Sequence, residues 1–167
     1  ITAILPIQSF DQDMSVVMGT RQGVIKRVSL ADFSRPRQSG IIAINLDEDD
    51  ALVGVSLTTS DDDIMLFSSS GKVIRFQNTD VRIMGRGARG VRGIRLKPED
   101  RVVSMVVADP NKLIMTVSSL GYGKKTLLSD FRKTGRGGQG ITAMQIPESA
   151  MIVGASGVSD DYDVFLI

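Results

Sequence analysis

The 167-residue sequence contains no cysteine, no histidine and no tryptophan. The absence of cysteine excludes a disulfide framework and a thiolate metal site. The absence of histidine removes the commonest general base and metal ligand of proteins. Aromatic residues make up only 5% of the chain, whereas 17 residues are glycine. This composition favours a turn-rich β protein with an aliphatic core.

Long apolar runs are also missing. No stretch approaches the ~20 apolar residues that a membrane-spanning helix needs, so we expect no membrane partner. The first ten residues, ITAILPIQSF, carry no basic segment of the kind that opens a signal peptide. The chain does not begin with methionine, and we therefore expect it to be a fragment of a longer protein.

What the chain does have is an internal repeat of about 50 residues. Equivalent positions recur in three sets, at Gly23, Gly71 and Gly121, at Gly40, Gly90 and Gly140, and at Asp32, Asp80 and Asp130. So many phased positions indicate tandem structural repeats. We assign residues 11–60, 61–110 and 111–160 to the three repeats of one partial domain that spans residues 1–167.

Each repeat is predicted to form a four-stranded unit. In the second repeat the predicted strands are residues 64–69, 72–77, 91–96 and 102–108, and a single helical turn is possible near residues 79–81. Glycine and Pro-Asp turns between these segments leave little room for a helix. The fourth strand is apolar on both faces, which is typical of a strand inside an assembly. The predicted fold is all-β, a propeller-like array of four-stranded blades.

The two ends of the chain fall outside these repeats. Residues 1–10 are in phase with the last strand of a preceding blade, and residues 161–167 are in phase with the first strand of a following blade. An interrupted repeat array exposes strand edges. One hypothesis is that the terminal strands pair with each other or with another copy of the chain.

Charge follows the repeat. Residues 21–40, 71–97 and 121–140 hold 18 of the 20 basic residues and only 3 of the 19 acidic ones, so the net charge is +15 inside these windows and −14 outside. Equivalent positions of stacked repeats fall on equivalent surfaces, which predicts a positive band along one rim. Such a band steers and binds a polyanion.

The residue types in the windows suit a phosphate backbone. Arginine makes bidentate contacts with phosphate oxygens, and glycine lets main-chain N–H groups approach an anion. Neither device reads bases, so the loops would position a duplex without sequence preference. The candidate DNA-binding residues are Arg21, Lys26, Arg27, Arg35, Arg37, Lys72, Arg75, Arg82, Arg86, Arg89, Arg92, Arg95, Lys124, Lys125, Arg132, Lys133 and Arg136, with loop glycines Gly85, Gly87, Gly90, Gly135, Gly137, Gly138 and Gly140.

Catalytic and metal sites are not indicated. The runs 85–90 and 135–140 fit the dinucleotide pattern GxGxxG, but that motif works between a strand and a helix, and a strand is predicted after each run. A phosphate-binding GxxxxGK[ST] loop is missing. The acidic runs 47–50 and 61–63 lack the spacing of a calcium-binding loop and are predicted to be solvated turns. We expect no catalytic residue, no metal and no cofactor.

Three segments carry a family resemblance: FSRPRQSGIIAINLDEDDALVGVSL, GKVIRFQNTDVRIMGRGARGVRGIRL and GYGKKTLLSDFRKTGRGGQGI. They closely resemble the C-terminal domain of the A subunit of bacterial DNA gyrase. The resemblance implies a β-pinwheel whose neighbouring blades exchange strands and whose basic rim wraps duplex DNA, in support of ATP-dependent negative supercoiling. It also implies, as partners in an A2B2 enzyme, the gyrase B subunit together with the rest of the A subunit. ATP and Mg are implied on other domains, and the implied location is cytoplasmic and nucleoid-associated, in bacteria.

One motif of that family is incomplete. The gyrase box reads Gln-[Arg/Lys]-Arg-Gly-Gly-[Lys/Arg]-Gly, and the nearest segment here is residues 134–140, TGRGGQG. It keeps Arg136, Gly137, Gly138 and Gly140 but lacks the first glutamine and the second basic residue. We therefore expect this chain to bind DNA more weakly than the whole domain and to wrap less of it.

Other readings of the sequence remain open. The C-terminal domain of the topoisomerase IV A subunit has a similar plan. A propeller-type protein-interaction module has a comparable period, although the aromatic signatures of WD40 and kelch repeats are absent. An RNA-binding RGG protein would carry its arginine-glycine runs in disordered sequence, whereas these runs alternate with patterned strands.

Overall fold

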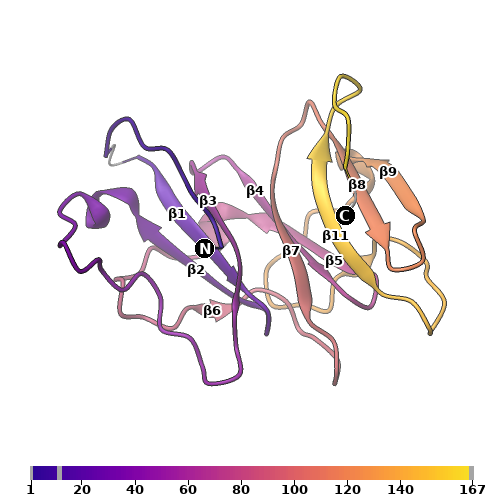
Figure 1. Cartoon of the computed structure of the whole chain (residues 1–167), viewed down its shortest axis with the longest axis horizontal. Helices are drawn as coiled ribbons and strands as arrows, with labels where there is room; N and C mark the ends of the chain where they lie inside the picture. Colours follow the sequence, from indigo (N-terminus) through magenta and orange to yellow (C-terminus); the bar gives the residue numbers. More distant parts are fainter. Residues whose placement is uncertain (1, 11–12, 166–167) are drawn as a thin grey trace.

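A computed structural model describes residues 2–10 and 13–165 of the chain. Within that part, short β-strands and turns form three antiparallel sheets, and the helical residues belong to 3-10 turns. Figure 1 shows the sheets following one another in chain order along the length of the molecule. The predicted all-β class is confirmed.

The first two sheets have four strands each. The first contains β1 (Ser15–Thr20), β2 (Val24–Ser29), β3 (Leu52–Thr58) and β6 (Val91–Arg92), in the order β3-β1-β2-β6. The second contains β4 (Asp63–Ser68), β5 (Lys72–Gln77), β7 (Val102–Ala108) and β10 (Ile141–Thr142), in the order β10-β5-β4-β7. In the part of the chain that is described, the third sheet has three strands, β8 (Leu113–Ser118), β9 (Gly123–Leu127) and β11 (Ile152–Val158), in the order β11-β8-β9.

Neighbouring repeats exchange strands. The strand β6 belongs to the second repeat but pairs with β2 of the first, with Val91 opposite Ile25. In the same way β10 of the third repeat pairs with β5 of the second, with Ile141 opposite Val73. The exchange that the family resemblance implies is therefore present twice.

The exchanged strands are shorter than predicted. Residues 91–96 were expected to form one strand, but the ladder ends at Arg92. The N–H groups of both Gly93 and Ile94 then donate to the same carbonyl, that of Gly23, so the regular alternation of a ladder stops there. Burial still alternates beyond the ladder, because Ile94 is buried and Arg95 is exposed.

A glycine precedes each exchanged strand and allows it to approach its partner. Gly90 has φ +101°, a value that side-chain-bearing residues rarely adopt, and Gly140 has φ +73°. A Cβ atom on Gly90 would lie 2.7 Å from the carbonyl oxygen of Ile25, and one on Gly140 would overlap the carbonyl oxygen of Val73. These two glycines therefore fix how closely one repeat docks on the next.

The predicted helical turn occurs in all three repeats. It forms the 3-10 turns η1 (Leu30–Phe33), η2 (Asn78–Asp80) and η3 (Leu128–Asp130). Each turn follows the second strand of its repeat and carries the phased aspartate of the sequence repeat.

The core lies between repeats as much as within them. One buried cluster combines Val17 and Ile25 of the first repeat with Ile64 and Phe76 of the second. A second cluster joins Phe67 of the second repeat to Phe131 of the third, whose rings meet edge to face with centroids 6.1 Å apart. Each repeat therefore buries part of its apolar surface against its neighbours, as in other repeat proteins.

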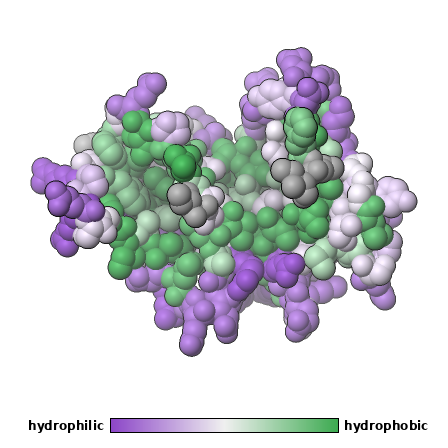
Figure 2. Space-filling model, viewed as in Figure 1, coloured by the Kyte–Doolittle hydropathy of each residue, from purple (hydrophilic) through white to green (hydrophobic). Residues whose placement is uncertain are grey.

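The fourth strand of the second repeat lies towards the inside, as predicted. β7 packs against both β3 and β11, and its residues are buried or half-buried throughout. In Figure 2 this side of the molecule shows an apolar surface, with hydrophilic residues gathered along the edge below it. β7 is thus partly covered by a neighbouring strand on each side.

The two predicted terminal strands are not seen. Residues 2–10 and 161–165 carry no strand, and residues 1, 166 and 167 of these segments lie outside the described residues. Their pairing with each other or with another copy stays a prediction.

Candidate nucleic-acid interface

The basic loops of consecutive repeats are hydrogen-bonded to one another. The side-chain amide of Asn45 donates to the carbonyl of Gly87 over 2.8 Å. One repeat further on, the N–H of Arg95 donates to Gly138 over 2.7 Å, and the N–H of Gly137 donates to Gly93 over 2.6 Å. Residues 34–47, 82–97 and 132–146 therefore form one connected array, which we call the basic loop series.

Most of the predicted cations are at the surface. Twelve are exposed: Arg21, Arg35, Arg37, Arg82, Arg89, Arg92, Arg95, Lys124, Lys125, Arg132, Lys133 and Arg136. Three are half-buried: Lys72, Arg75 and Arg86. The remaining two, Lys26 and Arg27, are buried.

The burial of Lys26 contradicts the prediction that this residue contacts DNA. Its side chain is fully buried, and its ammonium group donates to the carbonyl of Ala43 over 2.9 Å and to the carbonyl of Arg86. Burial lowers the pKa of Lys26, and the nearby charge of Arg86 lowers it further. Lys26 is therefore a link between two basic loops and offers nothing to a ligand at the surface.

The burial of Arg27 likewise contradicts the prediction that this residue contacts DNA. Only 8% of the residue is exposed, and burial lowers its pKa. Its guanidinium donates to the hydroxyl of Ser15 over 3.0 Å and to the carbonyls of Asn78 and Val81, both over 3.4 Å. These two carbonyls lie at the two ends of the 3-10 turn of the next repeat, so Arg27 fastens one repeat to the following one.

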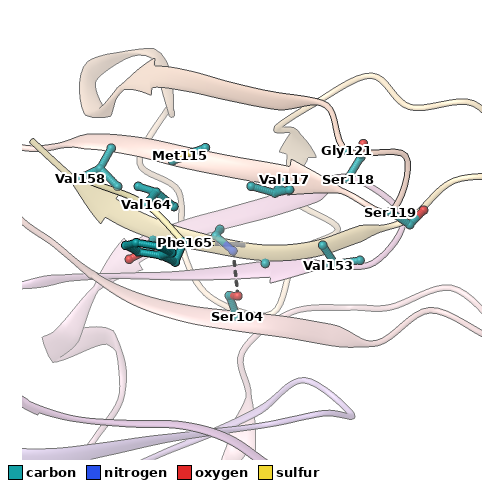
Figure 3. A pocket seen from close by; sticks show the side chains of 13 residues that line it. Ser104, Met115, Val117, Ser118, Ser119, Gly121, Val153, Val158, Val164 and Phe165 are labelled. Carbon is teal, nitrogen blue, oxygen red and sulfur yellow. Dashed lines mark hydrogen bonds between the residues drawn. The ribbon is translucent and has the colours of Figure 1, made fainter. Parts of the chain in front are cut away.

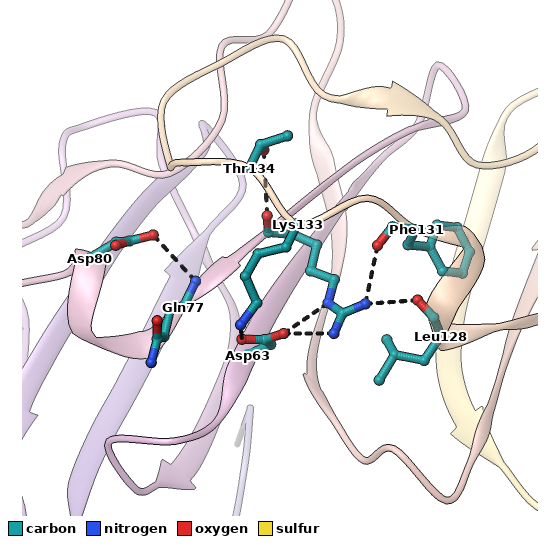
Figure 4. Close-up of polar contacts among 8 residues, drawn as sticks. Asp63, Gln77, Asp80, Leu128, Phe131, Lys133 and Thr134 are labelled. Carbon is teal, nitrogen blue, oxygen red and sulfur yellow. Dashed lines mark hydrogen bonds and ion pairs between the residues drawn. The ribbon is translucent and has the colours of Figure 1, made fainter.

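Arg75 makes the equivalent contacts one repeat later. Its guanidinium donates to the carbonyls of Leu128 and Phe131 over 2.8 and 3.1 Å. It also pairs with Asp63, whose carboxylate lies 2.7 Å away. Figure 4 shows the guanidinium between Asp63 and the two carbonyls. The guanidinium of Arg75 therefore also binds groups of the chain itself and joins two repeats.

Asp63 also changes the interpretation of the acidic runs. The run 61–63 was predicted to be a solvated turn, but Asp63 is only 5% exposed. Its second carboxylate oxygen lies 2.7 Å from the ammonium of Lys133, which comes from the next repeat (Figure 4). The prediction is wrong for Asp63, because its carboxylate is buried and paired with Lys133 of the next repeat. The same ion pair means that Lys133 already has a partner within the chain.

Four further cations have partners at the surface. Arg89 pairs with Asp47 over 3.1 Å, and Lys125 pairs with Asp160 over 3.2 Å. Arg21 donates to the carbonyl of Asp49 over 2.6 Å. Arg136 donates to the carbonyls of Asp80 and Arg92 over 2.9 and 3.1 Å.

A smaller set of exposed cations is left for an external ligand. Within residues 2–10 and 13–165, no side-chain hydrogen bond or ion pair is recorded for Arg35, Arg37, Arg82, Arg92, Arg95, Lys124 and Arg132. Six of the seven belong to the basic loop series.

The loop glycines also divide into two groups. Gly85, Gly87 and Gly135 have no atom within 4 Å of a notional Cβ, so their backbone faces open space. Gly138 has ordinary contact at 3.7 Å, and Gly137, with φ +84°, lies 3.5 Å from the carbonyl of Arg92. Gly90 and Gly140 are instead required for repeat docking, as described above. The open glycines can bring a polyanion close to the main chain.

An aspartate holds the first turn of the second repeat. Asp100 accepts hydrogen bonds from the hydroxyl of Ser69 and from both the N–H and the hydroxyl of Ser70. Burial by itself would raise the pKa of Asp100, but these hydrogen bonds together outweigh it and hold the pKa below its ordinary value. Asp100 therefore stays ionised as part of the turn.

A groove elsewhere on the molecule has a different character. It measures about 690 Å³ and lies on the third sheet, lined by residues that include Met115, Val117, Val153 and Phe165. Figure 3 shows Val164 and Phe165 lying over it and the N–H of Ala155 bonded to the Ser104 hydroxyl over 2.9 Å. None of its lining residues is charged, so it does not suit a polyanion.

Features of a metal centre, a membrane span or a dinucleotide site do not occur in the described part of the chain. No group of three or more His, Cys, Asp or Glu residues there could hold a metal ion. No helix there is long and apolar enough to cross a membrane. The segments that follow the two GxGxxG runs are β6 and β10, strands as predicted and not the helices of a dinucleotide site.

The arrangement of three repeats matches a known family. The model of the family described as "DNA gyrase C-terminal domain, beta-propeller" matches residues 15–59, 62–109 and 112–159. The chain belongs to this family. The matched segments include all three sheets and the basic loop series, and the predicted family resemblance is confirmed.

Curated DNA gyrase A subunits are similar over part of the chain. The protein of Salmonella typhimurium is 53% identical over 93 residues, and that of Haemophilus influenzae is 54% identical over 93 residues. Each alignment covers 56% of this chain and 11% of the relative. The aligned part is thus about a tenth of the length of these curated relatives.

Two solved structures resemble this chain. The C-terminal domain of DNA topoisomerase IV has a TM-score of 0.86 and 29% identity, covering 93% of this chain and 50% of that one. The DNA gyrase A C-terminal domain has a TM-score of 0.55 and 18% identity, covering 90% of this chain and 68% of that one. The second likeness shows the fold alone.

Proposed function

We propose that the chain binds duplex DNA along the basic loop series, without sequence preference, and bends the duplex around it. The observation that carries this proposal is the connection of the loops. Because hydrogen bonds join each loop to the next, the cations without internal partners are held in a fixed order along one array. A fixed array of arginines can follow a phosphate backbone, whereas separate mobile loops could not impose a bend.

The set of proposed DNA contacts is smaller than the sequence alone suggested. They are Arg35, Arg37, Arg82, Arg86, Arg92, Arg95, Lys124 and Arg132, supported by the open glycines Gly85, Gly87 and Gly135. Cations whose side chains already bind other parts of the chain are secondary DNA contacts or are excluded from the contact set. Bending 20–30 bp by 40–90° costs on the order of 1–6 kcal/mol, and several phosphate contacts can offset that cost.

The proposed role in the whole enzyme follows from the family. A gyrase that wraps DNA with this domain would present a crossover to its DNA gate and so support ATP-dependent negative supercoiling. The catalytic residues, the ATP and Mg sites, and the contacts with the B subunit in an A2B2 assembly would lie in other parts of that enzyme. A role on the bacterial chromosome implies a cytoplasmic location, in association with the nucleoid.

The test is duplex binding measured across a salt series. Each neutralised phosphate should contribute about −0.9 to the slope of log K against log salt. Replacement of Arg82, Arg92 and Arg132 by alanine should weaken binding to every sequence equally and reduce the slope by up to about 2.7 at this value per phosphate.

Arg101→Ala is the matched control, because Arg101 is exposed but lies outside the basic loop series. It should leave the slope unchanged. Absent or salt-insensitive binding by the unmodified chain would reject the proposal, and an altered base preference in the triple variant would contradict backbone contact.

A second candidate is the corresponding domain of topoisomerase IV. The observation that favours it is the likeness to the topoisomerase IV C-terminal domain over 93% of this chain. Both candidates predict DNA binding. Closed circular DNA that is relaxed while the chain is bound should change its linking number if the duplex is wrapped, and an unchanged linking number would contradict the proposed bending.

A further inference from the structure

Two grooves lie at equivalent places between consecutive repeats. The first junction groove, of about 370 Å³, lies between the first and second repeats, and the second junction groove, of about 70 Å³, lies between the second and third. Lining positions Gln22, Val24, Asn45, Asp47, Asp50 and Arg89 of the first correspond to Ser70, Lys72, Arg95, Lys97, Asp100 and Gln139 of the second. The spacing between corresponding residues is that of the sequence repeat.

The corresponding residues differ in charge. The charged residues that line the first groove are Asp47, Asp50, Arg89 and Arg92, two of each sign, so the groove is formally neutral. Those that line the second are Lys72, Arg95, Lys97 and Asp100, three positive and one negative, so its formal charge is +2. Two equivalent grooves therefore present very different surfaces to an anion.

Internal pairing increases the difference. In the first groove Arg89 is bound to Asp47 over 3.1 Å, so its charge is already compensated. In the second groove the one acid, Asp100, accepts hydrogen bonds from Ser69 and Ser70 of the adjoining turn. It is committed to that turn rather than to the cations.

The three cations of the second groove have no ionic partner among the described residues. Lys72 donates to the neutral hydroxyl of Thr142 over 3.0 Å. No side-chain hydrogen bond or ion pair is recorded there for Arg95 or Lys97. Ile94 and Leu96 are the two apolar residues among those that line the groove.

We propose that the second junction groove is a phosphate-binding site for one phosphodiester group of the DNA backbone. Arg95 offers a planar bidentate donor, while Lys72 and Lys97 add compact positive charges. The groove volume of about 70 Å³ corresponds to roughly two water molecules at ~30 Å³ each, which is space for a small anion. This site rests on the proposed DNA binding and adds Lys72 and Lys97 to the contact set.

The proposal makes the DNA-binding surface unequal along its length. The phosphate bound between the second and third repeats contributes more than any phosphate near Arg89. The arginine-rich segment 86–89 is the more prominent feature of the sequence, yet its Arg89 is paired with Asp47 of the preceding repeat.

The experiment compares Arg95→Ala with Arg89→Ala, which remove the same charge from exposed positions of the same loop. In duplex binding across a salt series, Arg95→Ala should reduce the slope by about 0.9, the value for one phosphate, and Arg89→Ala should leave it nearly unchanged. A third variant, Asn45→Arg combined with Asp47→Lys, places the residue types of positions 95 and 97 at the corresponding positions of the first groove and should increase the slope by about 0.9.

A second measurement does not depend on variants or on DNA. Inorganic pyrophosphate titrated into the unmodified chain should shift the amide NMR signals of residues 72, 95–97 and 139, and leave those of residues 22, 45–47 and 89 in place. Equal slopes for Arg95→Ala and Arg89→Ala, or equal shifts at both grooves, would overturn the site while leaving DNA binding intact. Failure of the unmodified chain to bind any duplex would instead reject the proposed function.

Discussion

Replacement of Asp63 by alanine should be one of the most destabilising single changes at the junction between the second and third repeats. Asp63 lies 2.7 Å from both Arg75 and Lys133, and its side chain is 6% exposed. Removing one partner of a buried ion pair costs about 3–5 kcal/mol, because the other charge is left buried without compensation.

The lower end of that range applies here. Arg75 keeps the carbonyls of Leu128 and Phe131 as acceptors, and Lys133, with 46% of its side chain exposed, can return to water at a cost of well under about 1 kcal/mol. We therefore expect Asp63→Ala to lose about 3 kcal/mol of unfolding free energy. At about 2–4 °C per kcal/mol for a chain of this size, the Tm should fall by roughly 6–12 °C.

The first repeat supplies a matched control. There the residue equivalent to Asp63 is Ser15, whose hydroxyl accepts a hydrogen bond from Arg27 over 3.0 Å. Asp63→Ser reproduces this pair and should recover about 1 kcal/mol relative to Asp63→Ala, the net value of one hydrogen bond.

The assay is urea unfolding followed by circular dichroism, with amide exchange to locate the effect. Asp63→Ala should accelerate exchange in the third repeat, around residues 128–131, more than in the first. A loss below about 1 kcal/mol, or an Asp63→Ser variant no more stable than Asp63→Ala, would refute the view that this ion pair fastens the repeats together.

Three further predictions concern the docking of repeats. Gly90→Ala should destabilise the chain by about 1–3 kcal/mol more than Gly40→Ala in urea unfolding, since both have positive φ but only Gly90 packs against a neighbouring carbonyl; equal losses would contradict this. The pKa of Lys26 is lowered in the folded state, so the unfolded state binds more protons and stability rises with pH. The unfolding free energy of the unmodified chain should therefore rise relative to that of Lys26→Met as the pH approaches the ordinary lysine pKa. A pH-independent difference between the two proteins would show that burial does not perturb the pKa of Lys26. Finally, β9 has no partner on its outer side in the described part of the chain, and residues 41–42 correspond to the exchanged strands β6 and β10. Copies should therefore associate head to tail in sedimentation velocity, and a monomer at every concentration would exclude it.

The sequence predicted the architecture well because its signals are local. Turn glycines, alternating apolar residues and a phased aspartate each act within a few residues of the chain. Their recurrence predicted three repeats with all-β structure and at most a single helical turn in each, and the family model matches three segments of the chain. The exchanged strand β6 proved shorter than predicted, because its ladder stops where two N–H groups share the carbonyl of Gly23.

The sequence by itself also determined where the charge lies, but only the tertiary structure decided which charges are free. Lys26 and Arg27 are adjacent in one strand, and alternation predicts that one of them faces water. Both are buried, because the following repeat covers the second face. The equivalent residues of the third repeat, Lys124 and Lys125, are exposed. The same position is thus internal or external according to whether a neighbouring repeat lies against it, and that contact is made by residues about 50 positions away.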